Sequence, residues 1–204
     1  MIKNIISGDW GKEEKQGNYI EKVYCIRGMD IPEVKYGNKG KMPIRYILEK
    51  NYKKKQLSSN DLVIEISGGS PTQSTGRIAL ITQSLLNRFD YPLICTNFCK
   101  IIKPKENYSL FLYYYWDYLY DSGRMFSYEN GTTGIKNLDY KALIKLEKIQ
   151  IPPKEEIIDF NNRITLLLNK IYQNSLEIEK LTKLRDTLLP KLMSGELDVS
   201  GVDI

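Results

Sequence analysis

The side chains with the clearest capacity for chemistry are hydrogen-bond donors in the turn-rich first three quarters of the chain. The basic candidates are Arg27, Lys35, Lys39, Lys41, Arg45, Arg77, Arg124 and Lys136, and the uncharged candidates are Ser70, Thr72, Gln73 and Asn137. Lysine and arginine neutralise phosphates, whereas arginine and the short polar side chains can also bond to base edges. These residues favour binding to a nucleic acid, although any one of them can equally be a solvated surface group.

The distribution of charge agrees with that interpretation. Residues 1–150 hold 23 Lys and Arg against 16 Asp and Glu, whereas residues 151–204 hold 7 against 9. The net charge of +5 therefore belongs to the front of the chain, as expected for a domain that binds a polyanion. Lys53, Lys54 and Lys55 are interpreted as a solvated turn or a phosphate contact rather than as readers of bases.

Catalytic chemistry finds little support. The chain has no histidine, which excludes Ser-His-Asp and Cys-His arrangements. The Gly-rich segment from residue 67 to residue 76 lacks the lysine of a phosphate-binding loop. Asp61 and Glu65 resemble the carboxylate pair of metal-dependent nucleases, but Ser67 stands where such sites place lysine. We therefore expect a non-catalytic protein that holds no cofactor of its own.

The cysteines predict neither a disulfide framework nor a metal site. Cys25, Cys95 and Cys99 are an odd number, and without histidine they do not complete a four-ligand zinc site. Packing within a strand is the better interpretation. The chain also lacks a signal peptide and a run of 18 uncharged apolar residues, so we expect it to be cytoplasmic.

The elements that must position the donors are short strands separated by turns. Strands are predicted at residues 23–26, 62–66, 77–82 and 93–102. Residues 108–120 are apolar on nearly every face and predict a buried helix, with a stacking platform for single strands as the alternative. A turn at 131–134 and a short helix from Asn137 through Ile144 complete a mixed α/β (α+β) globular domain over residues 1–150.

A long helix is predicted over residues 153–189, within a C-terminal region of residues 151–204. Pro152 and Pro153 can open a helix, and Glu155 and Glu156 complement its N-terminal dipole. Apolar residues then alternate at spacings of three and four, which is the a/d pattern of a coiled coil. The positions are Ile157, Phe160, Ile164, Leu167, Ile171, Asn174, Ile178, Leu181, Arg185, Leu188 and Leu192. Pro190 is expected to kink or end the helix.

Such a helix needs a partner. Its length is on the order of 50 Å, and a domain of 150 residues cannot cover its seam along the whole course. The seam therefore predicts pairing with a helix of another chain or of a second copy. Asn174 and Arg185 interrupt the seam, either as register devices that select the partner or as positions where the seam opens to solvent.

The end of this helix resembles a known family. Residues 181–197 (LTKLRDTLLPKLMSGEL) closely resemble the end of a repeat in specificity subunits of type I restriction–modification enzymes. IQIPP at 149–153 is similar to the junction that leads into the family's spacer helix, and GIKNL at 134–138 resembles the sequence before it. RGMDI at 27–31, DLVI at 61–64 and SGG at 67–69 followed by GR at 76–77 match the looser pattern of its target-recognition domains. The similarity covers essentially the whole chain.

The resemblance implies a division of labour. The recognition domain would read a few base pairs of double-stranded DNA through the major groove, and the spacer helix would dock methyltransferase subunits. S-adenosylmethionine and ATP would belong to partner subunits, the latter to a restriction/translocase subunit where one exists. Such subunits usually carry two recognition domains and two spacer helices, whereas this chain has one of each. A homodimer that reads a gapped palindrome is therefore expected.

Two alternatives stay open. The chain can be an incomplete half-subunit that works only when joined to another half. From a different class, it can be a coiled-coil adaptor whose basic domain binds protein or RNA. The adaptor interpretation predicts no association with a methyltransferase and no preference for duplex DNA.

Overall fold

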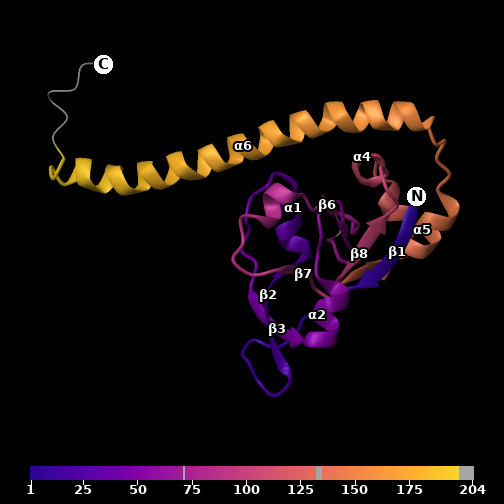
Figure 1. Cartoon of the computed structure of the whole chain (residues 1–204), viewed down its shortest axis with the longest axis horizontal. Coiled ribbons are helices and arrows are strands. Elements are labelled where there is room, and N and C mark those ends of the chain that lie inside the picture. Colours follow the sequence, from indigo (N-terminus) through magenta and orange to yellow (C-terminus); the bar gives the residue numbers. More distant parts are fainter. Residues whose placement is uncertain (71, 132–134, 198–204) are drawn as a thin grey trace.

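The computed structural model describes residues 1–70, 72–131 and 135–197. It comprises a body of three small sheets with flanking helices, and one long helix that crosses the body and extends well beyond it (Figure 1). This is the mixed α/β domain with a long C-terminal helix that the sequence predicts. Within the described ranges, no helix is both long and apolar enough to cross a membrane.

The central sheet has four antiparallel strands in the order β1-β8-β4-β6. Their bounds are Ile2–Ser7 for β1, Cys99–Pro104 for β8, Leu62–Glu65 for β4 and Ile78–Leu80 for β6. Because side chains alternate along a strand, the sheet supplies two cores at once. Val63, Ala79 and Ile101 pack into one apolar cluster, and Leu62, Ile64, Ile78 and Ile102 pack into the other.

The second sheet extends into the lower part of the body as drawn in Figure 1. It has the order β3-β2-β7, with bounds Ile44–Leu48 for β3, Tyr19–Ile26 for β2 and Leu93–Cys95 for β7. The pairing of β2 with β3 is antiparallel, and that of β2 with β7 is parallel. The short helix α1 (Ile31–Lys35) connects β2 to β3. Helices α2 (Glu49–Lys55) and α3 (Gln83–Leu86) link this sheet to the central one, since α2 follows β3 and α3 precedes β7.

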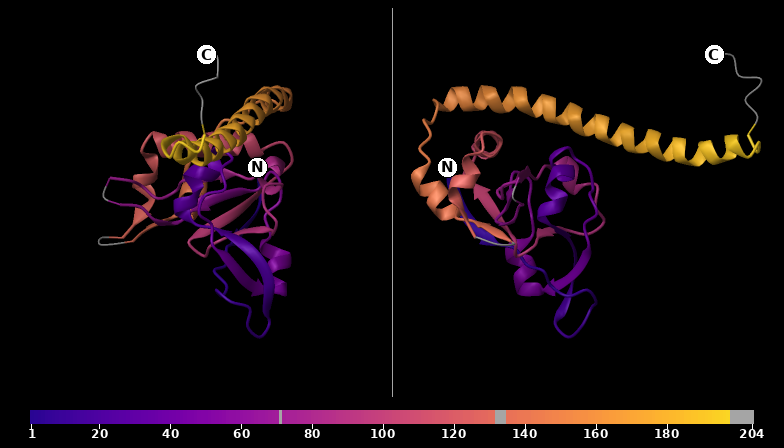
Figure 2. Two further views of the ribbon diagram at one scale, coloured as in Figure 1. Left: turned by 90° about the vertical axis from the view of Figure 1, so that its left-hand side faces the viewer. Right: turned by 180° about the vertical axis from the view of Figure 1, so that it is seen from behind.

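The third sheet is small and projects from the body. It pairs β5 (Ser67–Gly68) with β10 (Lys136–Leu138), and β10 with β9 (Glu129–Asn130). The loops that carry these strands extend outward on a side that the long helix does not cover (Figure 2). Of the turn predicted at 131–134, residues 132–134 lie outside the described ranges.

Two helices cover one face of the central sheet. In α4 (Ser109–Asp121), Leu110, Tyr113, Trp116 and Leu119 are buried, whereas Tyr118 is 65% exposed. The helix is thus found as predicted, but one of its faces meets solvent. Helix α5 (Tyr140–Leu146) starts at Asp139, whose carboxylate accepts a hydrogen bond from the Ala142 N–H at 2.9 Å.

The long helix α6 spans Lys154–Met193, and Pro153 precedes it. It continues one turn beyond Pro190, which corrects the expected end at residue 189. Pro190 lacks only its own N–H donor, so the residues after it can still form the last helical turn. The Ser194 N–H donates to the Pro190 carbonyl at 3.0 Å, and Gly195 follows with a φ of 75°.

Three further expectations need correction. The strand predicted over residues 93–102 is two strands, β7 and β8, because Thr96-Asn97-Phe98 forms a turn closed by the Cys99 N–H on the Thr96 carbonyl at 3.0 Å. The three lysines at 53–55 end helix α2 instead of forming a turn. Strands β1, β3, β5, β9 and β10 and helix α2 were not expected, and β6 is shorter than the predicted segment.

Candidate nucleic-acid interface

A hollow of about 610 Å³ opens at the base of the projecting sheet. Four separate segments line it, and the wall residues are Trp10, Arg27, Gly28, Met29, Glu65, Ser67, Gly68, Gly69, Gln73, Arg77, Thr96, Asn97 and Phe98. These segments are the chain after β1, the chain after β2, the stretch from the end of β4 to the start of β6, and the β7–β8 turn. The fold therefore brings Arg27, Gln73 and Arg77, which the sequence named as separate candidates, to one site.

Arg77 is fixed in the wall of this hollow by a carboxylate. Its Nε donates to Glu65 Oε2 at 2.8 Å and its Nη2 to Glu65 Oε1 at 2.6 Å. Glu65 is buried, and the bond to it raises the pKa of Arg77. Two glycines make room for this carboxylate, since a Cβ at Gly28 would lie 2.2 Å from Glu65 Oε1 and one at Gly68 would lie 2.7 Å from it. Arg77 is thus a pre-oriented donor.

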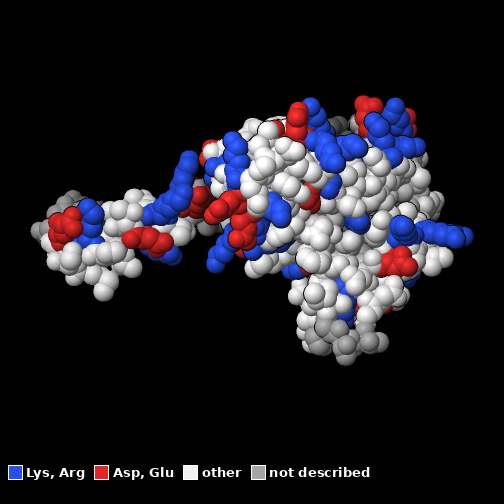
Figure 3. Space-filling view, turned by 90° about the horizontal axis from the view of Figure 1, so that it is seen from below, with Lys and Arg blue, Asp and Glu red and all other residues white. Residues whose placement is uncertain are grey.

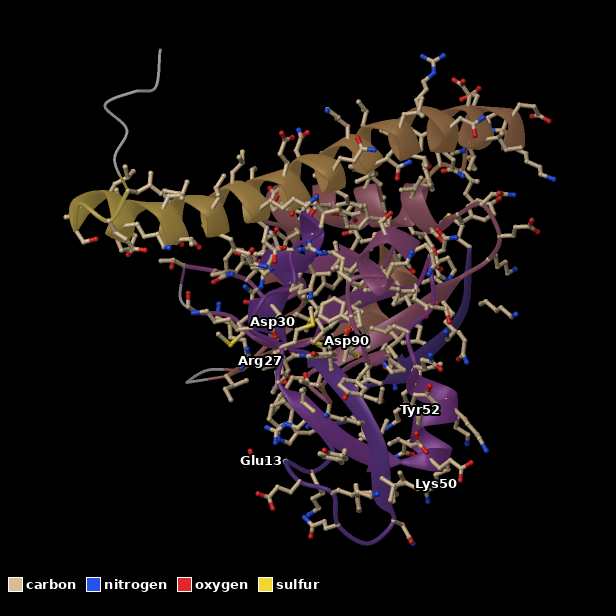
Figure 4. The ribbon with its side chains drawn as sticks, turned by 60° about the vertical axis from the view of Figure 1, so that its left-hand side comes forward. Glu13, Arg27, Asp30, Lys50, Tyr52 and Asp90 are labelled. Atoms are coloured by element: carbon tan, nitrogen blue, oxygen red, sulfur yellow. The ribbon has the colours of Figure 1, made fainter. Side chains whose placement is uncertain are left out.

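Arg27 is held in the same way by Asp30. Its Nε and Nη2 donate to the two carboxylate oxygens at 2.8 and 3.1 Å, and the bond raises the pKa of Arg27. Nη2 also donates to the Lys41 carbonyl at 2.7 Å. Figure 4 shows Arg27 and Asp30 side by side, away from α6. Arg27 therefore braces the turn that follows β2, and it has fewer donors to spare than Arg77.

Large apolar side chains form the rim of the hollow. Trp10 is 38%, Met29 63% and Phe98 50% exposed. The guanidinium of Arg45 lies over the Trp10 ring at 3.7 Å from its centroid and pairs with Glu13 at 2.8 Å. Arg45 is itself buried, and its guanidinium supports the Trp10 ring.

The projecting sheet presents uncharged polar groups beside the hollow. Ser70 Oγ accepts from the Thr72 and Gln73 backbone N–H groups at 3.3 and 3.1 Å, which closes a turn. Asn137 lies opposite Ser67 in the β5–β10 pair, and their side chains are hydrogen-bonded. Lys136 is held between Glu129, at 2.9 Å, and the ring of Phe126, at 4.9 Å. Ser70, Thr72, Gln73, Lys136 and Asn137 thus all belong to the projecting sheet and its loops, with Lys136 and Asn137 on opposite faces of strand β10.

Three predicted residues lie away from both the hollow and the projecting sheet. Lys35 binds Asp117 on α4 at 2.7 Å, and Arg124 binds Glu147 at 2.8 Å beside α5. Lys39 is exposed and lies 5.7 Å from the centroid of the Phe89 ring. Lys41 remains beside the hollow through its carbonyl bond with Arg27. The fold therefore separates the twelve candidates into a clustered majority and a remote minority.

On the face drawn in Figure 3, the described residues form no continuous basic band. Figure 3 shows Lys and Arg interspersed with Asp and Glu over one face of the body, and a projecting lobe with few charges. Six of the eight basic candidates, all except Lys39 and Lys41, form ion pairs with carboxylates. The site therefore relies on directed hydrogen bonds and apolar contact more than on bare charge.

Sequence reasoning missed the apolar rim and the carboxylates that hold the arginines. Trp10, Met29 and Phe98 come from three segments, and nothing in their local sequence marks them as neighbours. Asn97 and Thr96 carried a usable signal, since two polar residues within an apolar run favour a turn.

The carboxylates of Asp61 and Glu65 are bound to basic side chains of the same chain. Asp61 accepts from Lys103 Nζ at 2.8 Å and from the Ser58 N–H at 2.8 Å, while Glu65 binds Arg77. The three thiols are free and buried, and burial raises the pKa of Cys99 to about 12. The described part of the chain contains no cluster of Cys, Asp and Glu able to hold a metal ion.

Helix α6 lies on the body along its first half. Ile157 and Leu168 are buried, and Phe160 and Ile164 pack on the cluster that includes α4. Farther along, Tyr172 covers Gly37, Ser175 bonds to Asn38, and Glu179 pairs with Arg88, which also bonds to the Gly37 carbonyl. We name this second contact the latch. Ile157, Phe160 and Ile164, expected at a seam with another helix, therefore pack within their own chain.

A second stripe on α6 faces away from the body. The stripe that contacts the body continues through Leu168, Tyr172, Ser175 and Glu179. The heptad positions 167, 171, 174 and 178 each lie one residue before a member of that stripe. Leu167, Ile178 and Leu181 are 60%, 63% and 56% exposed, and Ile171, Asn174 and Arg185 are exposed too. A strict heptad drifts around a straight helix, so the two stripes separate. We name residues 167–188 at heptad positions the outer stripe, with Leu188 partly buried at its end.

Comparison with known proteins now identifies the class of this recognition domain and helix. Residues 3–186 match the family described as the type I restriction modification DNA specificity domain. The chain belongs to that family.

Two specificity subunits are similar to the chain. That of the type I restriction enzyme MjaIX from Methanocaldococcus jannaschii is 28% identical over 194 residues, which cover 89% of this chain and 36% of the relative. That of HindI from Haemophilus influenzae is 38% identical over 68 residues, which cover 33% and 15%. The matched regions thus span about a third of the MjaIX subunit and 15% of the HindI subunit. A solved chain from a study of assembly and conformational transition of the type I R-M system aligns with a TM-score of 0.48 at 16% identity, over 92% of this chain and 42% of that one.

Proposed function

We propose that this chain is a non-catalytic specificity subunit of a type I restriction–modification system, which reads double-stranded DNA with the hollow and the projecting sheet. The observation that carries the proposal is the group of pre-oriented donors at this site, in a chain of the DNA specificity family. A donor held by a buried carboxylate keeps its direction before DNA arrives, so it discriminates between acceptors at low entropic cost.

Arg77 is the proposed reader of bases. The hydrogen bonds between the described residues and its guanidinium use only Nε and one proton of Nη2, which leaves the Nη1–Nη2 edge for acceptors outside the chain. Two parallel N–H groups on that edge match O6 and N7 of guanine in the major groove. Arg77→Ala should relax sequence preference by about 1–3 kcal/mol at one base pair. A uniform loss over all sequences would instead assign Arg77 to a phosphate.

The outer stripe of α6 is the proposed dimer seam. Apolar side chains exposed at heptad spacing favour a second helix, and an identical copy provides a matching stripe. Two copies in antiparallel pairing have two-fold symmetry, so their DNA target is a gapped palindrome. In this proposal the seam uses Leu167, Ile171, Asn174, Ile178, Leu181, Arg185 and Leu188, while Ile157, Phe160 and Ile164 remain with their own body.

The helix pair also docks methyltransferase subunits in this proposal. S-adenosylmethionine would bind to them, and ATP to a restriction or translocase subunit, so the specificity chain itself needs no cofactor. Co-expression with a methyltransferase subunit encoded beside this chain should yield a complex that purifies through a tag on either protein.

The decisive experiment is selection from random-sequence duplexes with the purified full chain. We expect recovery of two identical, inverted half-sites separated by a gap of unspecified sequence. A single asymmetric motif would contradict the symmetric pairing and favour an incomplete half-subunit. No enrichment, together with failure to bind the methyltransferase subunit, would contradict DNA recognition and favour an adaptor.

A further inference from the structure

Two exposed apolar side chains are mounted rigidly on the rim of the hollow. Met29 and Phe98 belong to different turns and line the same hollow as Arg77. Each exposes half or more of its surface. Exposure of a large apolar side chain is unfavourable in water, so two of them at one polar site mark a surface that a ligand covers.

The mount of Met29 is a short 3-10 turn, Gly28–Asp30. The Asp30 N–H donates to the Arg27 carbonyl at 3.0 Å, and the Asp30 carboxylate accepts from the Arg27 side chain and from the Arg27 and Lys41 N–H groups at 3.0 and 3.2 Å. This turn fixes the backbone on both sides of Met29, which directs its thioether side chain outward.

The mount of Phe98 is the β7–β8 turn. The Phe98 carbonyl accepts from the Ile66 and Ser67 N–H groups at 2.9 and 3.2 Å, which ties the turn to the start of the projecting sheet. Thr96 and Cys99 on either side of the turn are buried. The Phe98 ring therefore stands on a backbone held by three strands.

The chemistry of the covering ligand follows from what surrounds these two side chains. A flat apolar face is needed to pack on Phe98 and Met29, and an edge with hydrogen-bond acceptors is needed to meet Arg77 and Gln73. A nucleobase offers both, whereas a phosphate offers only the acceptors. Since six of the eight basic candidates are already paired with carboxylates, apolar contact supplies part of the affinity that bare charge does not.

We propose that Phe98 and Met29 form a wedge that enters the DNA between neighbouring base pairs and unstacks one step in each half-site. This inference rests on the proposed function and adds a mode of recognition to it. Proteins that insert apolar side chains at a base step kink the duplex there, and pyrimidine–purine steps open most easily. The wedge thus reads the deformability of a step, while Arg77 reads the edge of an adjacent base.

The test uses the duplex recovered by selection with the full chain. 2-Aminopurine is placed at each adenine position in turn, because its fluorescence rises when it loses its stacking neighbour. We expect a rise of several fold at one step per half-site on binding of the unaltered chain. Phe98→Ala and Met29→Ala should abolish the rise and weaken binding about tenfold each, which corresponds to about 1.4 kcal/mol.

Two further variants serve as controls. Tyr118→Ala removes an exposed aromatic side chain on α4, outside the hollow, and should change neither signal nor affinity. Phe98→Leu keeps an apolar wedge and should retain much of the fluorescence rise, and thermal unfolding of each variant shows whether the body remains folded.

Each outcome decides one claim. Failure of the selection overturns the proposed function and the wedge with it. A selected duplex that the chain binds without a fluorescence rise at any position overturns the wedge alone. Loss of the rise in Tyr118→Ala to the same extent as in Phe98→Ala also overturns it, because the effect would then not belong to the hollow.

Discussion

The two halves of α6 carry the same alternation of apolar residues but have different surroundings. From Ile157 to Glu179 the helix contacts the body, and the latch is the last of these contacts. No described residue after Ser175 is buried. The comparison teaches that periodicity identifies a face that needs cover without identifying what covers it. In the first half the body provides the cover, at the heptad positions Ile157, Phe160 and Ile164 and then, from Leu168, on a stripe one residue away from them. In the second half, our proposal assigns the cover to a second chain.

The strongest test of this difference replaces two residues in the outer stripe. Ile178→Asp with Leu181→Asp places two carboxylates in the proposed seam, and we expect self-association to weaken at least a thousandfold, about 4 kcal/mol. Stability of the monomeric body should be unchanged because both residues are exposed. Sedimentation velocity over a range of concentrations measures the association. An unaltered chain that is monomeric throughout, or a double variant that still pairs, would contradict the seam.

The next largest effect is a difference in stability between variants at adjacent residues, one on the stripe that contacts the body and one on the outer stripe. Leu168→Ala removes a buried side chain between α6 and the body, and should lower the free energy of unfolding by about 2–5 kcal/mol. Its matched control is Leu167→Ala, at a residue 60% exposed, which should cost less than about 0.5 kcal/mol in a dilute monomeric sample. Urea unfolding followed by fluorescence measures both. Equal losses would show that the helix does not lie on the body as described.

The smallest effect concerns the latch. Lys183 and Arg88 lower the pKa of Glu179, so its carboxylate contributes stability above its ordinary pKa, and this is lost as pH falls through the lowered value. Arg88→Gln should cost about 1 kcal/mol at most near neutral pH, since Glu179 is partly exposed. The difference between variant and parent should shrink when Glu179 is protonated, as measured by unfolding at pH 3 and pH 7. A pH-independent difference would assign the loss to the Gly37 carbonyl bond instead.

Local signals in the sequence predict the elements better than they predict the site. Helix α6 and five of the ten described strands (β2, β4, β6, β7 and β8) follow from periodicity and turn residues. Arg27 and Arg77 were expected only as two of several basic side chains in the turn-rich region. What the sequence does not reveal is which carboxylate holds each arginine, because Glu65 and Arg77 are twelve residues apart and meet across two strands. The rim of Trp10, Met29 and Phe98 depends likewise on contacts among distant segments. Lys35 and Arg124 show the reverse, since their basic character is used within the fold.

Gly37 sets a rule for grafting other reading domains onto this helix. A Cβ there would lie 2.3 Å from the Tyr172 ring, and the residue has a φ of +81°, so only glycine allows this approach. The tilt of the helix against its domain thus depends on one missing methyl group. A transplanted domain would have to bring a glycine to the same contact, or its reading surface would point along a different axis from that of its twin.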